Sequence, residues 1–292
     1  MDPRPDAGPT TTATAAPDSP DSPGSSGRSR ASATPRPTAA LPATPSLADP
    51  AALADQLTGA LDTVAEPGAA EDGVRRAALF EQLSSRLLAE VPTAAADRVL
   101  GRLRGAARAQ AVADVTAARE LLALTAPQPK LPPWRIVTPP PAAELLRHYR
   151  RAERATGVPW EYLAAIHLVE TRMGRIRGTS AAGAQGPMQF LPSTFAQYGA
   201  GGDINDPGDA ILAAGRMLRA DGAPEDLGGA LYAYNHSSHY VRAVTAYATR
   251  MARSPAAYDI YWHWQVVYRQ VDRLWLLPEG YPRVRARVVA LG

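Results

Sequence analysis

The stretch GVPWEYLAAIHLVETRMG, residues 157–174, has the pattern of a helix that starts after a glycine and a proline. Gly157 closes the segment before it, and Pro159 suits a first helical position. The spacing of the apolar residues then predicts a helix from about Pro159 to Met173. Two further helical stretches flank it in sequence, so this segment predicts the centre of an all-helical domain.

Glu170 is the unusual residue of this predicted helix. At about 100° per residue it projects between Leu163 and Ile166, on the apolar stripe. A buried carboxylate is unfavourable, so either the helix ends early and Glu170 is solvated, or the carboxyl group is needed there. A glutamate held among apolar groups has a raised pKa and can donate a proton near neutral pH.

Composition bounds the class of protein. The chain has 292 residues, 46% of them hydrophobic and 20% charged, which is typical of a soluble globular protein with appendages. Its formal charge is +3, without a block of Lys and Arg that would predict a nucleic-acid groove. The lack of cysteine excludes disulfides and thiolate metal sites. No run of 18 apolar residues predicts a transmembrane helix, and no signal peptide is visible after Met1.

The first 141 residues divide into three segments. Residues 1–50 hold 11 of the 28 prolines and are predicted to be a disordered tail. Residues 51–126 show helical spacing, including a long run over 95–124, and predict either a module that binds a partner or a small bundle that packs on the main domain. Residues 127–141 hold seven prolines, which predicts a semi-rigid linker or a ligand for a proline-binding partner.

The remaining chain predicts a helical domain and an extension. Helical patterns recur over residues 142–254, which are long enough to form their own core. Residues 255–292 contain the strand-like segments VVY and LWLL, which predict a short C-terminal β-hairpin. The predicted fold class is therefore mainly α, with a helical N-terminal segment.

A glycine-rich loop and a later Tyr-Asn pair add candidate binding groups. Amides supply hydrogen bonds to sugar hydroxyls, and aromatic or apolar side chains pack on the faces of sugar rings. Each of these residues alone has a structural explanation, Gln189 as a hydrogen-bonding residue of the loop and Met188 and Tyr234 as packed side chains. Their value lies in their combination. They are Met188, Gln189, Phe190, Tyr234 and Asn235.

Three motifs in the expected order make the segment from about Val158 to Met251 resemble the soluble lytic transglycosylase (SLT) domain, which has a goose-type-lysozyme-like fold. The first is Glu170-Thr171 at the end of a helix, with threonine replacing the commoner serine. The second is matched by Ser180, Gly183, Ala184, Gly186, Gln189, Phe190 and Pro192. The third is Tyr234-Asn235 after an alanine.

The resemblance implies an enzyme of the bacterial cell wall, without cofactor or metal. Glu170 would be the single acid/base that cleaves the β-1,4 bond between N-acetylmuramic acid and N-acetylglucosamine, leaving a 1,6-anhydro end. The implied ligand is a peptidoglycan glycan strand. The implied substrate-binding residues are Thr171, Ser180, Met188, Gln189, Phe190, Tyr234 and Asn235.

Several alternatives stay open on the sequence. A glycosidase that uses water needs a second carboxylate, and the candidates Asp203, Asp206 and Asp209 are better explained as turn or capping residues. The rivals are a hydrolytic muramidase on the same fold and a weakly active scaffold that binds the wall. His236 and His239 lack a third ligand at a recognisable spacing, which argues against a metal site. The expected location is extracytoplasmic, and residues 1–141 are the expected site of any cell-wall protein partner.

Overall fold

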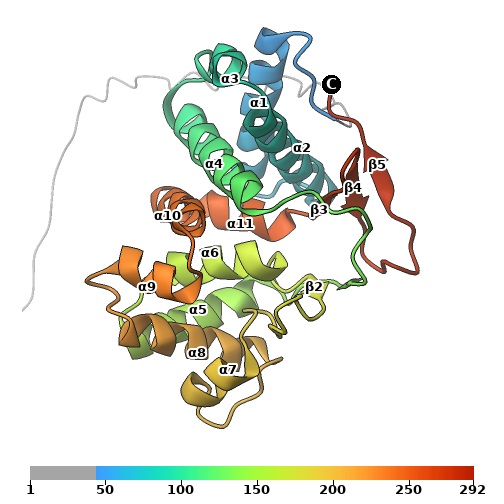
Figure 1. Ribbon diagram of the computed structural model, residues 1–292. Coiled ribbons are helices and arrows are strands. Elements are labelled where there is room, and N and C mark those ends of the chain that lie inside the picture. Colours follow the sequence, from blue (N-terminus) through green and yellow to red (C-terminus); the bar gives the residue numbers. More distant parts are fainter. Residues whose placement is uncertain (1–43) are drawn as a thin grey trace, which may run out of the picture. The chain divides into compact units, whose positions relative to one another are not determined.

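The computed structural model describes residues 44–292, which form eleven helices and five short strands (Figure 1). The mainly helical fold class is confirmed. The predicted disordered tail falls, up to residue 43, outside the described residues. None of the helices in the described part is long and apolar enough to cross a membrane.

Four helices occupy the N-terminal part: α1 (Pro50–Ala65), α2 (Glu71–Glu90), α3 (Thr93–Leu100) and α4 (Gly105–Leu124). Asp49 begins α1, because its side chain accepts hydrogen bonds from the N–H groups of Ala51 and Ala52. The long helical run expected over 95–124 is wrong in one respect, since residues 101–104 separate α3 from α4. Gly105, with a φ of +51°, permits the change of direction that apolar spacing alone does not reveal.

The central domain contains six helices: α5 (Ala142–Thr156), α6 (Trp160–Thr171), α7 (Pro192–Tyr198), α8 (Pro207–Ala220), α9 (Leu227–Tyr234) and α10 (Ser238–Arg253). Gly157 ends α5 with a φ of +76°, as expected for a C-terminal glycine. Asp206 begins α8 by accepting a hydrogen bond from the N–H of Asp209, also as expected. An eleventh helix, α11 (Pro255–His263), follows α10 directly.

The N-terminal helices pack on the central domain and do not extend away from it. Helix α4 lies along α10, and α2 meets α11 (Figure 1). Leu61 of α1, Ala78 of α2 and Ala117 of α4 are buried in the same apolar core as the central helices. The bundle therefore shares a core with the domain that contains Glu170.

A buried ionic network joins the two parts. Arg250 of α10 donates to Glu81 of α2 at 2.7 Å and also contacts Asp114 of α4. Trp264 donates to Glu81 at 2.9 Å, and Tyr261 donates to Asp114 at 2.5 Å. Burial raises the pKa of Glu81, while Arg250 opposes that rise. All three charged side chains are almost inaccessible to water, so each buried charge is compensated by the opposite charge of its partners and not by solvent.

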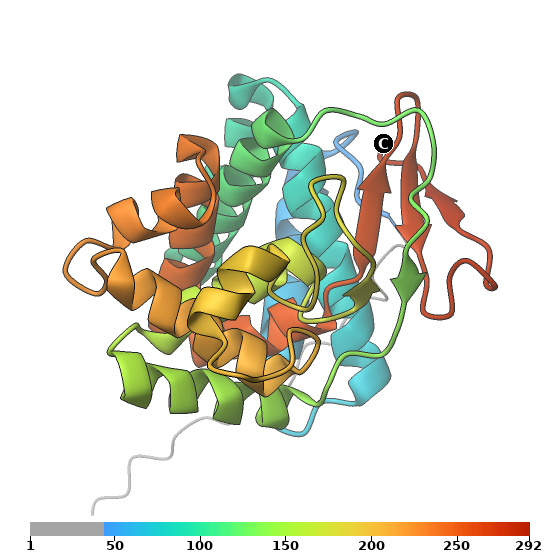
Figure 2. The same ribbon diagram turned by 60° about the horizontal axis from the view of Figure 1, so that its bottom comes forward.

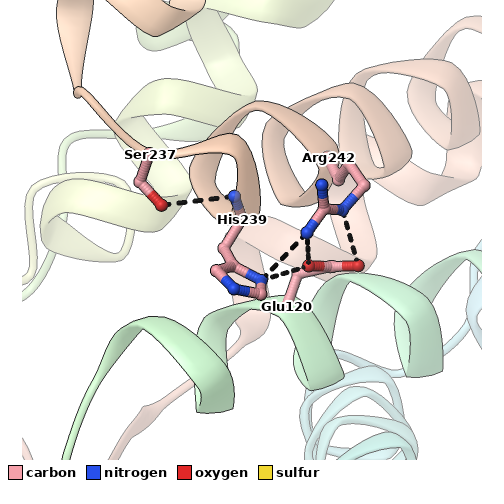
Figure 3. Close-up of polar contacts among 4 residues, drawn as sticks. All are labelled: Glu120, Ser237, His239 and Arg242. Carbon is pink, nitrogen blue, oxygen red and sulfur yellow. Dashed lines mark hydrogen bonds and ion pairs between the residues drawn. The ribbon is translucent and has the colours of Figure 1, made fainter.

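A second, more exposed contact joins α4 to the start of α10 (Figure 3). Both oxygens of Glu120 accept from Arg242 at 2.8 Å, and His239 Nδ1 lies 2.6 Å from Glu120 Oε2. Ser237 begins α10 by accepting from the N–H of His239. The hydrogen bond from Arg242 is the main cause that lowers the pKa of Glu120. His239 is therefore engaged with the bundle through Glu120.

The proline-rich segment, expected to be a semi-rigid linker, packs against the rest of the fold. It contains β1 (Arg135–Ile136), which pairs antiparallel with β2 (Ile176–Arg177). Figure 2 shows the segment in green, running from the end of α4 along the red sheet. Ile136 is only 4% exposed, and its N–H donates to the carbonyl of Tyr281. Prolines prevent helix here, but the apolar residues between them still bury their side chains.

The expected C-terminal hairpin is confirmed and is extended by one strand. Strand β3 (Val266–Arg269) pairs antiparallel with β4 (Leu274–Leu277), and β5 (Arg287–Val289) pairs with the other side of β4. Val266 and Leu277 pack against Ile136 of the proline-rich segment. The sheet thus packs against the proline-rich segment, and that segment pairs with β2, which follows the Glu170 helix in sequence.

Candidate active site

Glu170 lies in the last turn of α6, partly exposed to a cavity of about 300 Å³. Its Oε1 accepts a hydrogen bond of 2.8 Å from the hydroxyl of Tyr240. Burial raises its pKa to about 7, and the Tyr240 hydrogen bond works in the opposite direction. The raised pKa expected from the apolar stripe is confirmed. At neutral pH a large fraction of the carboxyl group is therefore protonated and able to act as an acid.

The helix ends immediately after Glu170 and Thr171. Arg172, Met173 and Gly174 have φ values of +53°, +58° and +85°, so the chain turns sharply in the left-handed region. The N–H groups of Arg172 and Met173 donate to the carbonyls of Leu168 and His167. Two consecutive non-glycine residues with positive φ are unfavourable, and such strain is commonly retained at functional sites.

Thr171 is expected from the sequence to bind substrate, but its side chain does not line the cavity. Its side chain is 0% exposed. Its hydroxyl donates to the carbonyl of Pro187 at 2.6 Å and accepts from the N–H of Gly174 at 3.1 Å. Thr171 therefore ties the end of the Glu170 helix to the glycine-rich loop, as a positioning residue.

Replacement of Thr171 by valine tests this assignment. Valine keeps the shape but leaves the Pro187 carbonyl and the Gly174 N–H without a partner, which costs about 1–3 kcal/mol for each buried group. We expect the free energy of unfolding from urea denaturation to fall by about 2 kcal/mol or more. Thr171→Ser, which retains the hydroxyl, should lose about 1 kcal/mol or less. Equal stability of the valine and wild-type proteins would contradict the assignment.

The glycine-rich loop is held by its own backbone. The N–H of Ser180 donates to the Ala184 carbonyl, and the Ser180 hydroxyl accepts from the N–H of Ala184. At Gly186 (φ +72°) an added Cβ would lie 1.9 Å from the carbonyl oxygen of Ile204, so only glycine fits. Gln189, itself at φ +51°, donates through its amide to the Gly186 carbonyl at 3.0 Å. Ser180 and Gln189 are partly exposed, and their side chains make these hydrogen bonds to the backbone of the loop.

The apolar residues of the second and third motifs form the support beneath the loop. Met188 is 0% and Phe190 3% exposed, so their side chains lie beneath the surface of the loop. Tyr234 donates to the carbonyl of Met188 at 2.7 Å and packs against the ring of Phe190. Its ring stacks on that of Tyr240 at 6.3 Å, which aligns the donor to Glu170.

Tyr240 contacts Glu170 through its hydroxyl, a contact that the sequence did not predict. It lies one turn into α10, on a face shared with the buried Val244 and Tyr247. That spacing marks it as buried, but its hydroxyl meets a carboxylate 70 residues away. Only the packing of α10 on α6 brings the two together.

Among residues 44–292, Glu170 is the only acidic residue that lines its cavity. Asn235 and Tyr240 line the cavity with it. The candidate second carboxylates are engaged elsewhere: Asp209 accepts from the Asp203 N–H at 3.0 Å, and Asp206 begins α8. A single titratable acid near pH 7 is suited to proton transfer in both directions.

Residues 148–255 match the family model described as the transglycosylase SLT domain. The chain contains an SLT domain. No curated protein and no solved structure matches the chain. An SLT domain implies transglycosylase-type action on peptidoglycan, and the family acts outside the cytoplasmic membrane. All the site residues expected from the sequence fall within the matched range.

The cavity beside Glu170 is not built by the SLT domain alone. Its walls include residues from α2 and α4, from the proline-rich segment and from β3, all outside the matched range. The aromatic residues Trp134, Trp264 and Tyr268 are among them, and Trp134 packs edge-on against Tyr268 at 5.5 Å. A second cavity of about 340 Å³ lies along the glycine-rich loop and shares Ile176 with the first. The SLT domain supplies the acid, and the flanking elements supply much of the opposite wall.

Proposed function

We propose that the protein is a lytic transglycosylase that cleaves the β-1,4 bond between N-acetylmuramic acid and N-acetylglucosamine in peptidoglycan. The observation that carries this proposal is the Glu170 carboxyl group, with a pKa of about 7, which is the only acid from the described part of the chain in a cavity lined by aromatic and amide groups. Glycosidases that use water employ two carboxyl groups, one of which activates the water. A single acid favours an internal nucleophile from the sugar itself.

In the proposed reaction the protonated Glu170 gives its proton to the bridging oxygen. The bond from C1 of the muramoyl sugar to that oxygen breaks, and the electron pair leaves with the oxygen as the glucosamine 4-hydroxyl. The positive charge that develops at C1 is stabilised by the neighbouring N-acetyl oxygen. The Glu170 carboxylate then removes the proton of the 6-hydroxyl, whose oxygen attacks C1 and forms the 1,6-anhydro ring. Glu170 returns to its acid form, and no water is consumed.

The internal attack is favoured because the 6-hydroxyl is held on the same sugar. Well-oriented intramolecular groups reach effective molarities of about 10⁵ M or more, far above the concentration of water. Tyr240 stabilises the carboxylate between the two proton transfers by donating to Oε1. We place this activity outside the cytoplasmic membrane, where peptidoglycan lies.

Digestion of purified sacculi in ¹⁸O-labelled water tests the proposal. We expect mass spectrometry to find muropeptides whose muramoyl ends lack one water and carry no label. Labelled reducing ends would instead identify a hydrolytic muramidase on the same fold. Absence of any release by the wild-type protein would support a wall-binding scaffold.

Tyr240→Phe should shift the pH dependence of this activity. The hydrogen bond from Tyr240 lowers the pKa of Glu170, so its removal raises that pKa further above about 7. Since the first step requires the protonated acid, we expect the alkaline limb of the kcat profile to move to higher pH. Tyr232→Phe, which changes an exposed hydroxyl on α9, serves as the control and should leave the limb in place. A limb that moves to lower pH would contradict the assigned role.

A further inference from the structure

Three arginines line the same cavity as Glu170. Arg86 comes from α2, Arg172 from the turn after α6, and Arg269 from the end of β3. Arg86 and Arg269 lie outside the range that matches the SLT family, whereas Arg172 directly follows Thr171. Packing of the bundle and the sheet on the SLT domain therefore assembles a cluster of positive charge beside the acid.

Only one of the three arginines has a carboxylate partner among residues 44–292. Arg86 Nε donates to Glu90 at 3.0 Å, while its buried Nη2 has no hydrogen-bond partner there. Arg172 donates to the carbonyl of Leu168 at 3.0 Å, and no ion pair links Arg172 or Arg269 to an acid in this part of the chain. The cluster thus carries an excess of positive charge.

The charges in the cluster are unfavourable to one another. Burial lowers the pKa of Arg172, and it also lowers that of Arg86. Repulsion from Arg172 and Arg269 lowers the pKa of Arg86 further, which places the three guanidinium groups within electrostatic range of one another. Glu170 neutralises them only in part, because burial raises its pKa to about 7. An anion that entered the cavity would relieve this repulsion and supply the missing acceptors.

We propose that Arg86, Arg172 and Arg269 bind a carboxylate of the muramoyl residue next to the bond cleaved at Glu170. The inference rests on the proposed function for the identity of the strand. Muramic acid differs from glucosamine by a lactyl ether, whose carboxyl group is either free or joined to a peptide that carries carboxylates of its own. Because N-acetylglucosamine is neutral, a basic wall on one side of the cavity fixes which sugar occupies that side.

Binding to two matched strands tests the proposal. Strands stripped of peptide carry free lactyl carboxylates, and the same strands converted to lactyl amides differ from them only in charge. The Glu170→Gln protein removes turnover, so calorimetry reports affinity alone. We expect the carboxylate strands to bind about tenfold tighter than the amide strands, the size of one charge-assisted hydrogen bond. The difference should shrink at high salt.

Arginine variants in the same background locate the effect. Arg269→Gln and Arg86→Gln should each reduce the preference for carboxylate strands to about twofold or less. Arg287→Gln, an exposed change of the same type on β5 that lies outside the cavity lining, should keep the full preference. Peptide-bearing strands and their amidated forms are measured in parallel. A preference seen with them alone would support the proposal and assign the carboxylate to the peptide.

Equal affinity for the charged and neutral forms of both strand types would overturn the proposal, as would full preference in both cavity variants. Failure of the proposed function is seen separately. If the wild-type protein releases no muropeptides although the Glu170→Gln protein still prefers the charged strands, the carboxylate site exists without the reaction. A protein that releases anhydro ends without the preference has the reaction without the site.

Discussion

Glu170→Gln should reduce kcat for release of anhydro-muropeptides by about 10²–10⁴-fold, the usual contribution of a general acid. The amide cannot donate an acidic proton to the bridging oxygen, and it cannot later accept one from the 6-hydroxyl. The residual activity of the variant should no longer change with pH around 7, because the titrating group with a pKa of about 7 is gone, so the loss should be largest below pH 7. Quantified muropeptide release over time gives the measurement.

The stability of the same variant separates chemistry from folding. Tyr240 still donates to the amide oxygen, so the local contact persists. In the wild-type protein the folded-state pKa of Glu170 is raised above its unfolded value, so stability declines as pH rises from about 4.5 through 7. Glutamine removes that decline, and the variant should be as stable as the wild type or more so at neutral pH. Glu161→Gln, at the start of the same helix, should retain activity. Loss of folding in Glu170→Gln, or equal loss of activity in Glu161→Gln, would contradict the assignment.

Arg250→Met should have the largest effect on stability, lowering the free energy of unfolding by about 3–5 kcal/mol. Methionine fills much of the space but leaves Glu81 and Asp114 as buried acids without a cation. Their remaining donors, Trp264 and Tyr261, are neutral and compensate only in part. Chemical denaturation near pH 7 measures the loss.

Two further variants distinguish the buried network from a general effect of removing charge. Arg253→Met, an exposed change at the end of the same helix, should alter stability by about 0.5 kcal/mol or less. Adding Glu81→Gln and Asp114→Asn to Arg250→Met removes the two unpaired charges and keeps acceptors for Trp264 and Tyr261. We expect this triple variant to recover most of the lost stability. A single Arg250→Met as stable as the wild type would refute the coupling of the bundle to α10.

The helices and strands whose formation depends on residues close in sequence were largely predictable. Apolar spacing and terminal residues located α6 to within two residues, and Gly157 and Asp206 were assigned correctly as helix boundaries. The C-terminal hairpin was likewise visible in its apolar strands, though not β5. These features follow from local hydrogen bonding and backbone preference, which act over a few residues.

Residues that contact partners far away in sequence were harder to predict. A threonine beside Glu170 is expected from the sequence to line the cleft, yet Thr171 is buried because the loop that carries Pro187 packs over it. Tyr240 meets Glu170 only because α10 lies against α6. The proline-rich segment reads as a spacer, since proline content says nothing about whether the residues between prolines find an apolar surface.

The sequence alone determined that this protein is mainly helical, that it contains an SLT-like domain and that one glutamate lies on an apolar face. These features can be inferred from sequence because periodicity and short motifs are local properties. Tertiary structure alone decided what surrounds that glutamate. It buried Thr171 and Met188, aligned Tyr240, and brought Arg86 and Arg269 to the same cavity from opposite ends of the chain. Burial and electrostatic interaction depend on distance in space, and separation along the chain does not encode that distance.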